Sequence, residues 1–168
     1  VQGSPFDRYC HLSRSLLFAK SGYEVLAIEP VSHNRAALKQ SLCLNPDVRS
    51  RVSVIGTALG APQAAAPWIA QSPSSNIGNA VLRCGTRARC SDTNHTGGGH
   101  CEEVALSTLD AVLGRHLGGA RVTLAKIDAE GAECDILEGG LSLFARHRPA
   151  MILVELQRRM PDVTVLLR

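Results

Sequence analysis

The sequence predicts an open, mostly parallel α/β sheet with helices on both of its faces. Five short apolar runs are mostly continuous rather than alternating, which is typical of strands buried on both faces of a parallel sheet. Helical patterns lie between these runs. Strand and helix alternate at a spacing that favours right-handed crossover connections. The length of 168 residues suggests one domain, over residues 1–168.

The first third of the chain predicts two helix–strand units. Residues 11–22 place apolar side chains on one helical face and end at Gly22, a residue that often closes a helix. The run "EVLAIE" at 24–29 follows as a strand. Residues 34–45 repeat apolar positions at helical spacing and stop near a proline, and "RVSVIGT" at 51–57 is the next strand.

The middle of the chain departs from this alternation. Residues 61–101 are rich in Ala, Pro, Ser and Gly, and such a length is unusual for a loop inside a compact domain. We expect a partly irregular surface excursion, in which "IGNAVL" at 77–82 is a candidate short strand. After a strand at 103–106, the segment 107–117 opens a helix, with Ser107 as N-cap and Asp110 at N3, close to a capping box.

The last third predicts two further strands around one helical segment. "VTLAKID" at 122–128 and "AMILVEL" at 150–156 are the strands, and 131–147 is the helical segment, followed by Pro149. In open α/β sheets, ligands bind beyond the carboxyl ends of the strands. Polar residues fall at four of these ends: Glu29, Thr57, Asp128 and Glu155.

The overall composition is that of a globular domain and gives no sign of nucleic-acid or membrane partners. Hydrophobic residues make up 45% and charged residues 20%, enough apolar material for a core. The net charge is only +3, and no run of Lys and Arg resembles a nucleic-acid footprint. No apolar stretch approaches the ~18 residues that a membrane-spanning helix needs. The N-terminus lacks an initiator Met and a signal-peptide pattern, so we expect a truncated N-terminus and assign no compartment.

Glu29 and Pro30 follow the first apolar strand. A carboxylate offers two adjacent acceptor oxygens, so Glu29 can accept both hydroxyls of a ribose. The alternative is a glutamate that ends a strand before a turn-forming proline.

Four carboxylates follow the strand 122–128 within the stretch "KIDAEGAECDIL": Asp128, Glu130, Glu133 and Asp135. Acidic residues suit the first turn of a helix because they oppose its dipole. They also suit a site, as acceptors that orient a substrate hydroxyl or act as a base. Lys126 lies two residues before Asp128 in the strand, so both side chains can face one side, and a buried lysine needs such a partner.

The pattern C-x5-C-x4-H-x4-H-C runs from Cys84 to Cys101. Thiolate and imidazole are ligands of zinc, but the close C-x2-C pair of common zinc modules is absent. A disulfide or a disordered insert are the alternatives, and we predict no metal site.

Several motifs together resemble the FkbM family of methyltransferases, over about residues 16 to 156. They are "VLAIEP", "ALG" (58–60), "NIGNAVL" (76–82), "LSTLD" (106–110), "KIDAEGAECDILEGG" (126–140) and "RPAMILVEL" (148–156). The resemblance implies a Rossmann-like, class I methyltransferase-like sheet and S-adenosylmethionine as cofactor. It also implies an acceptor hydroxyl on a glycan or small molecule.

The same resemblance implies roles for particular residues. Glu29 and Pro30 would hold the cofactor ribose, and Thr57 and Ala58 would border the adenine. Asn76 and Gly78 would match a loop on the cofactor side or in the active site. Asp128 and Glu130 would face the methyl-transfer site, with Asp128 the first choice for a base. Glu155 matches an acid at a strand end, to which no role is assigned.

Two departures leave alternatives open. The family has a D-x-G-A-N-x-G-like loop after its first strand, which should fall near 6–12, and this chain has "FDRYCHL" there. The chain also ends twelve residues after Leu156, so we expect a sheet that is incomplete at both ends. A non-catalytic methyltransferase-like binding or structural domain is therefore the alternative to an O-methyltransferase. A nicotinamide-dependent dehydrogenase would need G-x-G-x-x-G before residues 24–29, and this motif is absent.

Overall fold

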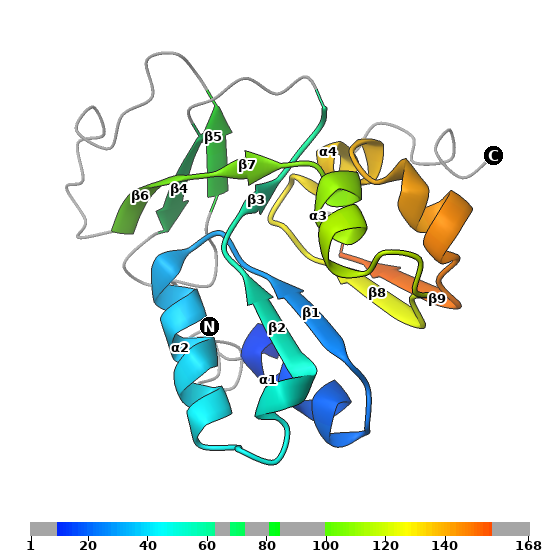
Figure 1. The fold of residues 1–168 in the computed structure, drawn as a ribbon. Coiled ribbons are helices and arrows are strands. Elements are labelled where there is room, and N and C mark those ends of the chain that lie inside the picture. Colours follow the sequence, from blue (N-terminus) through cyan, green and yellow to red (C-terminus); the bar gives the residue numbers. More distant parts are fainter. Residues whose placement is uncertain (1–9, 63–67, 73–80, 85–99, 156–168) are drawn as a thin grey trace.

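The computed structural model describes residues 10–62, 68–72, 81–84 and 100–155 (Figure 1). Its helices are α1 (Cys10–Lys20), α2 (Ser32–Cys43), η2 (Arg49–Arg51), α3 (Leu109–His116), α4 (Glu133–Glu138) and η4 (Leu143–His147, a π-helix). Its strands are β1 (Val25–Ile28), β2 (Val52–Ile55), β3 (Ala58–Leu59), β4 (Trp68–Ser72), β5 (Val81–Cys84), β6 (His100–Val104), β7 (Leu106–Ser107), β8 (Leu124–Ile127) and β9 (Met151–Val154).

The predicted parallel pairing is present, but the strands do not join into one sheet within the described residues. β1 pairs with β2, β3 with β7 and β8 with β9, all in parallel. β5, β4 and β6 form a separate antiparallel sheet. The single continuous sheet expected from the sequence is thus replaced by four small ones, because β1 and β8 approach each other through side chains and not through backbone hydrogen bonds.

β1 packs against hydrophobic residues on both faces, as its continuous apolar sequence predicts, and its four residues are partly buried. Val25 and Ala27 pack on one side against the hydrophobic cluster of α1, α2 and β2. Leu26 and Ile28, which alternate with them, pack on the other side against the cluster around α3, β8 and α4. Because successive side chains of a strand point to opposite faces, β1 contributes side chains to both hydrophobic clusters.

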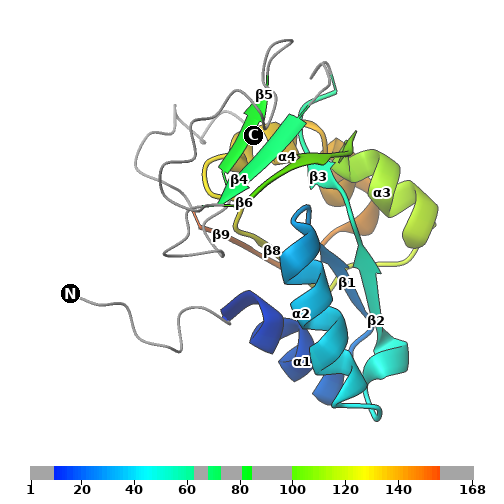
Figure 2. The same ribbon diagram turned by 90° about the vertical axis from the view of Figure 1, so that its left-hand side faces the viewer.

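Helices lie on both sides of β1, as the sequence predicts. α1 and α2 contribute Ala19, Leu38 and Leu42 to the first cluster, and α3 contributes Leu109 and Leu113 to the second. Figure 2 shows α1 and α2 on the side of β1 and β2 that lies opposite α3. Among the described residues, no helix is long and apolar enough to cross a membrane.

Parts of the segment 61–101 lie within the described residues. They supply β4, β5 and the start of β6, whose register pairs Trp68 with Cys84 on one side and with Val104 on the other. The strand expected at 77–82 overlaps β5, Val81–Cys84, at residues 81 and 82, and its first four residues lie outside the described part of the chain. The three strands pair in antiparallel fashion, unlike the strand pairs β1–β2, β3–β7 and β8–β9.

Two predicted helix ends can be compared with the structure. Gly22 follows α1 with φ +92°, a backbone conformation that favours glycine, as expected. The N-cap of α3 is Thr108 rather than Ser107, because Ser107 is still paired as the end of β7. The Thr108 side chain accepts the backbone N–H of Ala111 at 3.2 Å. Asp110 instead accepts the backbone N–H and the hydroxyl of Ser142, at 2.9 and 2.6 Å.

Gly139, at the end of α4, touches the chain just after β3. A Cβ atom at Gly139 would collide with the carbonyl oxygen of Gly60. The backbone contact cannot yield by rotating a side chain, and Gly139 also accepts the Asp110 N–H at 2.8 Å. Because Gly139 has no side chain, α4 and α3 can pack close to β3. This packing places the loop before α4 near the end of β1.

We predict that Gly139→Ala lowers the free energy of unfolding by about 1–3 kcal/mol, because the added methyl group overpacks a backbone contact. The control is Gly114, inside α3, where an added methyl group would meet no atom within 4 Å. Gly114→Ala should raise the free energy of unfolding by about 0.5–1 kcal/mol through helix propensity. Urea denaturation measures both, and equal effects of the two substitutions would contradict the close approach of Gly139 to Gly60.

Candidate functional site

The carboxyl ends of β1, β2 and β8 lie on the side of the molecule that holds the β4–β5–β6 sheet (Figure 1). Ile28, Ile55 and Ile127 are the last residues of these strands. Glu29, Thr57 and Asp128 follow them closely, as the sequence predicts. The candidate site therefore lies where these strands end. It combines segments that are about 100 residues apart in the chain.

Glu29 turns its carboxylate back onto the start of α2. Its Oε1 accepts the backbone N–H of Val31 at 2.8 Å. Arg35, one turn into α2, donates to the carbonyl oxygens of Glu29, at 3.1 Å, and of Pro30. The strand end, the proline and the helix start are thus tied together, and a carboxylate has lone pairs for further donors beyond this N–H.

Burial raises the pKa of the Glu29 carboxyl above its ordinary value of 4.5. The hydrogen bonds from Val31 and Asn34 and the charge of Arg35 act in the opposite direction, while the charge of Glu102 raises the pKa further. The partly buried carboxylate therefore has a large desolvation cost, which hydrogen-bond donors from a ligand would offset.

Glu102 is a site residue that the sequence does not reveal. It lies on β6, and its Oε1 accepts the backbone N–H of Ser32, the first residue of α2. The two residues are 70 positions apart in the chain, so no local pattern predicts the contact.

Thr57 and Ala58 lie at the expected edge, but their side chains are turned into the protein. Thr57 is 8% exposed, and its hydroxyl donates to the carbonyl oxygen of Ala105 at 2.9 Å. Ala58 is 0% exposed. A contact between these residues and an adenine ring stays a prediction, and it would involve their backbone more than their side chains.

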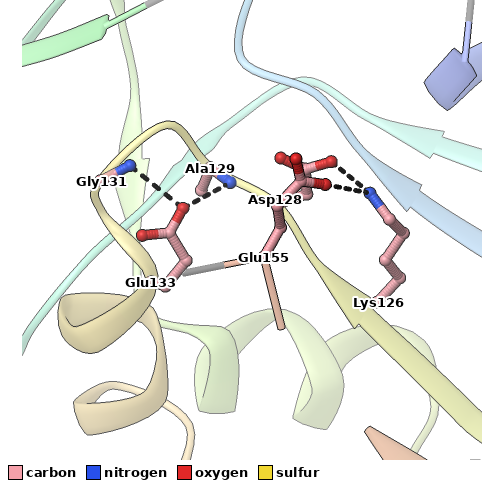
Figure 3. Close-up of polar contacts among 6 residues, drawn as sticks. All are labelled: Lys126, Asp128, Ala129, Gly131, Glu133 and Glu155. Carbon is pink, nitrogen blue, oxygen red and sulfur yellow. Dashed lines mark hydrogen bonds and ion pairs between the residues drawn. The ribbon is translucent and has the colours of Figure 1, made fainter. Parts of the chain in front are cut away.

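Lys126 and Asp128 face the same side of β8 and form an ion pair, as predicted (Figure 3). Their side chains are 15% and 11% exposed. Lys126 also lies 3.8 Å from Glu155, whose side chain is 66% exposed, at the end of β9. The ammonium group of Lys126 thus lies within ion-pair distance of two carboxylates, those of Asp128 and Glu155.

Glu133 holds the loop between β8 and α4 rather than pointing into solvent. Its side chain is 0% exposed, and Oε1 accepts the N–H groups of Ala129 and Gly131, both at 3.0 Å (Figure 3). Its second oxygen, Oε2, is buried with no hydrogen-bond partner among the described residues. Of the four acidic side chains in this stretch, Glu133 therefore organises the loop, whereas Asp135 is exposed.

The loop held by Glu133 has an unusual backbone. Glu130 has φ +50° and Gly131 has φ +104°, values that non-glycine residues rarely adopt. Two successive residues in this region turn the chain sharply between Asp128 and α4. The partly buried Glu130 is thereby fixed at the strand-end edge, two residues from Asp128.

Some predicted positions lie outside the described residues. These are Asn76 and Gly78, and also most of the Cys/His pattern. Cys101 is described and is disulfide-bonded, so it offers no thiolate to a metal. The part of the chain that the structure describes contains no group of three or more His, Cys, Asp or Glu residues arranged to hold a metal ion.

The family model of the methyltransferase FkbM domain matches residues 4–167. This chain belongs to the FkbM methyltransferase family. The match covers nearly the whole chain and confirms the resemblance seen in the motifs. Searches of curated proteins and of solved structures returned no match.

Membership of the FkbM family identifies the domain as a methyltransferase and fits the α/β architecture with parallel strand pairs. Within the FkbM motifs, Glu29 directly follows β1 and Asp128 directly follows β8.

We predict that Lys126 and Asp128 stabilise the fold jointly. In a double-mutant cycle of Lys126→Met and Asp128→Asn, the coupling energy should be about 1–2 kcal/mol, because both groups are largely shielded from water. The control cycle is Lys126→Met with Glu155→Gln, where Glu155 is 66% exposed, and its coupling should stay below about 0.5 kcal/mol. Urea denaturation at neutral pH measures both cycles. Equal coupling energies in the two cycles would show that the Lys126–Asp128 pair stabilises the fold no more than the exposed Lys126–Glu155 pair does.

We predict that Glu29 makes the stability of the domain depend on pH. Because its pKa is raised on folding, the folded state binds more protons than the unfolded state at pH values above 4.5. The contribution of Glu29 to the free energy of unfolding therefore falls as the pH rises from 4.5 through the raised pKa. Glu29→Gln, which keeps an oxygen for the Val31 N–H, should remove this slope and gain stability relative to wild type across that window.

Thermal unfolding between pH 4 and pH 7 checks this prediction. Glu24→Gln, a matched change at an exposed position just before β1, is the control and should run parallel to wild type. If Glu29→Gln also ran parallel to wild type, burial of the Glu29 carboxyl would have no energetic consequence.

Proposed function

We propose that this domain transfers a methyl group from S-adenosylmethionine to a hydroxyl oxygen of a sugar or small-molecule acceptor. The observation that carries the proposal is the pair of shielded carboxylates at one edge of strand ends. Glu29 follows β1 and Asp128 follows β8. Carboxyl ends of parallel strands are where α/β domains bind ligands.

The residues around Glu29 fit the ribose of this cofactor. The carboxylate is partly buried, is braced through Val31, and has lone pairs beyond the one that Oε1 uses for this bond. Two ribose hydroxyls can donate to it, which would offset the desolvation that raises its pKa. Pro30 fixes the chain direction immediately after this acceptor.

The cofactor supplies an electrophilic methyl group, and the residues of this chain orient the acceptor oxygen and take up its proton. Asp128 is the proposed base. Lys126 donates a hydrogen bond to it, and the loop held by Glu133 starts at the next residue, Ala129. Glu130, two residues on and partly buried, is the second candidate for the base. A positioned carboxylate contributes about 10²–10⁴-fold to the rate of such a proton transfer.

A non-catalytic binding or structural domain is the competing function. It is favoured by the segment near 6–12, where the sequence lacks the glycine-rich loop typical of the family. Residues 6–9 lie outside the described part, and residues 10–12 are in α1. Cofactor binding and turnover separate the two functions.

The first test is calorimetric titration with S-adenosylhomocysteine. We expect micromolar binding by the wild-type chain and loss of binding in Glu29→Ala. A wild-type chain that is folded by circular dichroism and does not bind would contradict the cofactor assignment.

The second test is methyl transfer from labelled S-adenosylmethionine to a panel of glycan and small-molecule hydroxyl acceptors. Asp128→Asn should lower kcat by about 10²–10⁴-fold and change cofactor affinity little. Asp135→Asn, a matched change at an exposed position of the same stretch, should keep wild-type turnover. Undiminished turnover in Asp128→Asn would remove Asp128 from the role of base, and binding without turnover on any acceptor would favour the non-catalytic function.

A further inference from the structure

The start of α2 receives two carboxylates, one from the residue after β1 and one from β6. Glu29 accepts the N–H of Val31 at 2.8 Å, and Glu102 accepts the N–H of Ser32. Val31, the N-cap residue, has no side-chain oxygen and makes no side-chain cap of its own. Because the two N–H groups belong to consecutive residues, the two carboxylates lie next to each other.

Glu102 reaches this place from a different part of the fold. β6 passes beside the start of α2 in both views (Figures 1 and 2). Cys101, its neighbour on β6, is disulfide-bonded, and β6 pairs along its length with β4. Glu102 therefore lies on a strand that is held by backbone pairing and by a neighbouring disulfide, and not in a loop.

The two carboxylates place negative charge at the start of α2, where the helix dipole stabilises it. The N–H groups at the start of a helix carry partial positive charge and commonly bind phosphate groups of nucleotides. Here Glu29 and Glu102 occupy these N–H groups. Arg35 supplies one positive charge on the same helix, and its guanidinium is directed at the carbonyl oxygens of Glu29 and Pro30.

We propose that Glu102 determines the charge specificity of the cofactor site, so that a cofactor with positive charge near its ribose binds and nucleotides with phosphate there are rejected. The proposal rests on the proposed function, since it takes Glu29 as the ribose acceptor. S-adenosylmethionine has a positively charged sulfonium next to its ribose, whereas S-adenosylhomocysteine has a neutral thioether there. A negative pair at this place attracts the first more than the second, which also favours release of the spent cofactor.

The test is calorimetric titration of wild type and Glu102→Gln with S-adenosylmethionine and S-adenosylhomocysteine. The Gln side chain keeps an oxygen for the Ser32 N–H and removes only the charge. We expect the ratio of the two affinities to fall on the order of five-fold, since one unit of charge is lost at a partly buried position. We also expect the preference of the site for adenosine over adenosine monophosphate to shrink.

Two further variants separate charge from structure. Glu103→Gln makes the same change one residue on, at an exposed position on the opposite face of β6, and should leave the affinity ratio unchanged. Glu102→Ala removes the acceptor of the Ser32 N–H as well as the charge, and should lower both affinities in addition to lowering their ratio. Thermal unfolding of each variant gives the folded fraction for the titrations.

The outcomes are distinguishable. Wild-type binding of both ligands with an unchanged ratio in Glu102→Gln would overturn this proposal alone and leave Glu102 a purely structural cap of α2. Absence of binding by the folded wild-type chain would overturn the proposed function and this proposal with it. A fall in the ratio for Glu102→Gln that 1 M salt reduces would support a charge effect, because salt screens such interactions.

Discussion

The packing of β1 on both of its faces is the constraint on which the rest of the structure depends. Its alternate residues enter two different hydrophobic clusters, so a shift of the strand by one residue would exchange Val25 and Ala27 with Leu26 and Ile28. The larger side chains fill the cluster around β8, and the smaller ones lie against α1 and α2. With β1 fixed in this register, Glu29 is delivered to one place at the strand end, and α2 starts soon after it.

Three acidic residues of the site have partners that stabilise their charge. Asp128 has the ammonium group of Lys126, Glu29 has a backbone N–H at a helix start, and Glu133 has two backbone N–H groups of its own loop. Partly shielded carboxylates need such partners because desolvation penalises their charge. The acidic stretch after β8 thus divides into a candidate base, Asp128, and a residue that shapes the loop, Glu133.

Much of the fold could be predicted because the signals are local. Continuous apolar runs located β1, β2, β8 and β9 to within a few residues, and Gly22 marked the end of α1. The N-cap of α3 was displaced by one residue because pairing of Ser107 in β7 outweighed its capping preference. The separation of the strands into small sheets, and the antiparallel sheet between residues 68 and 104, depend on pairing between distant segments, which composition does not encode.

The sequence by itself determined the family, the alternation of helix and strand, and the acidic residues at the strand ends. It also determined the pair of Lys126 and Asp128, because residues two apart in a strand face the same side. Only the tertiary structure decided that Glu133 is buried, since its burial depends on how α4 packs against α3 and β8. Only the tertiary structure brought Glu102 to the start of α2, because a contact across 70 residues depends on how β6 crosses the fold and leaves no mark on the sequence around either partner.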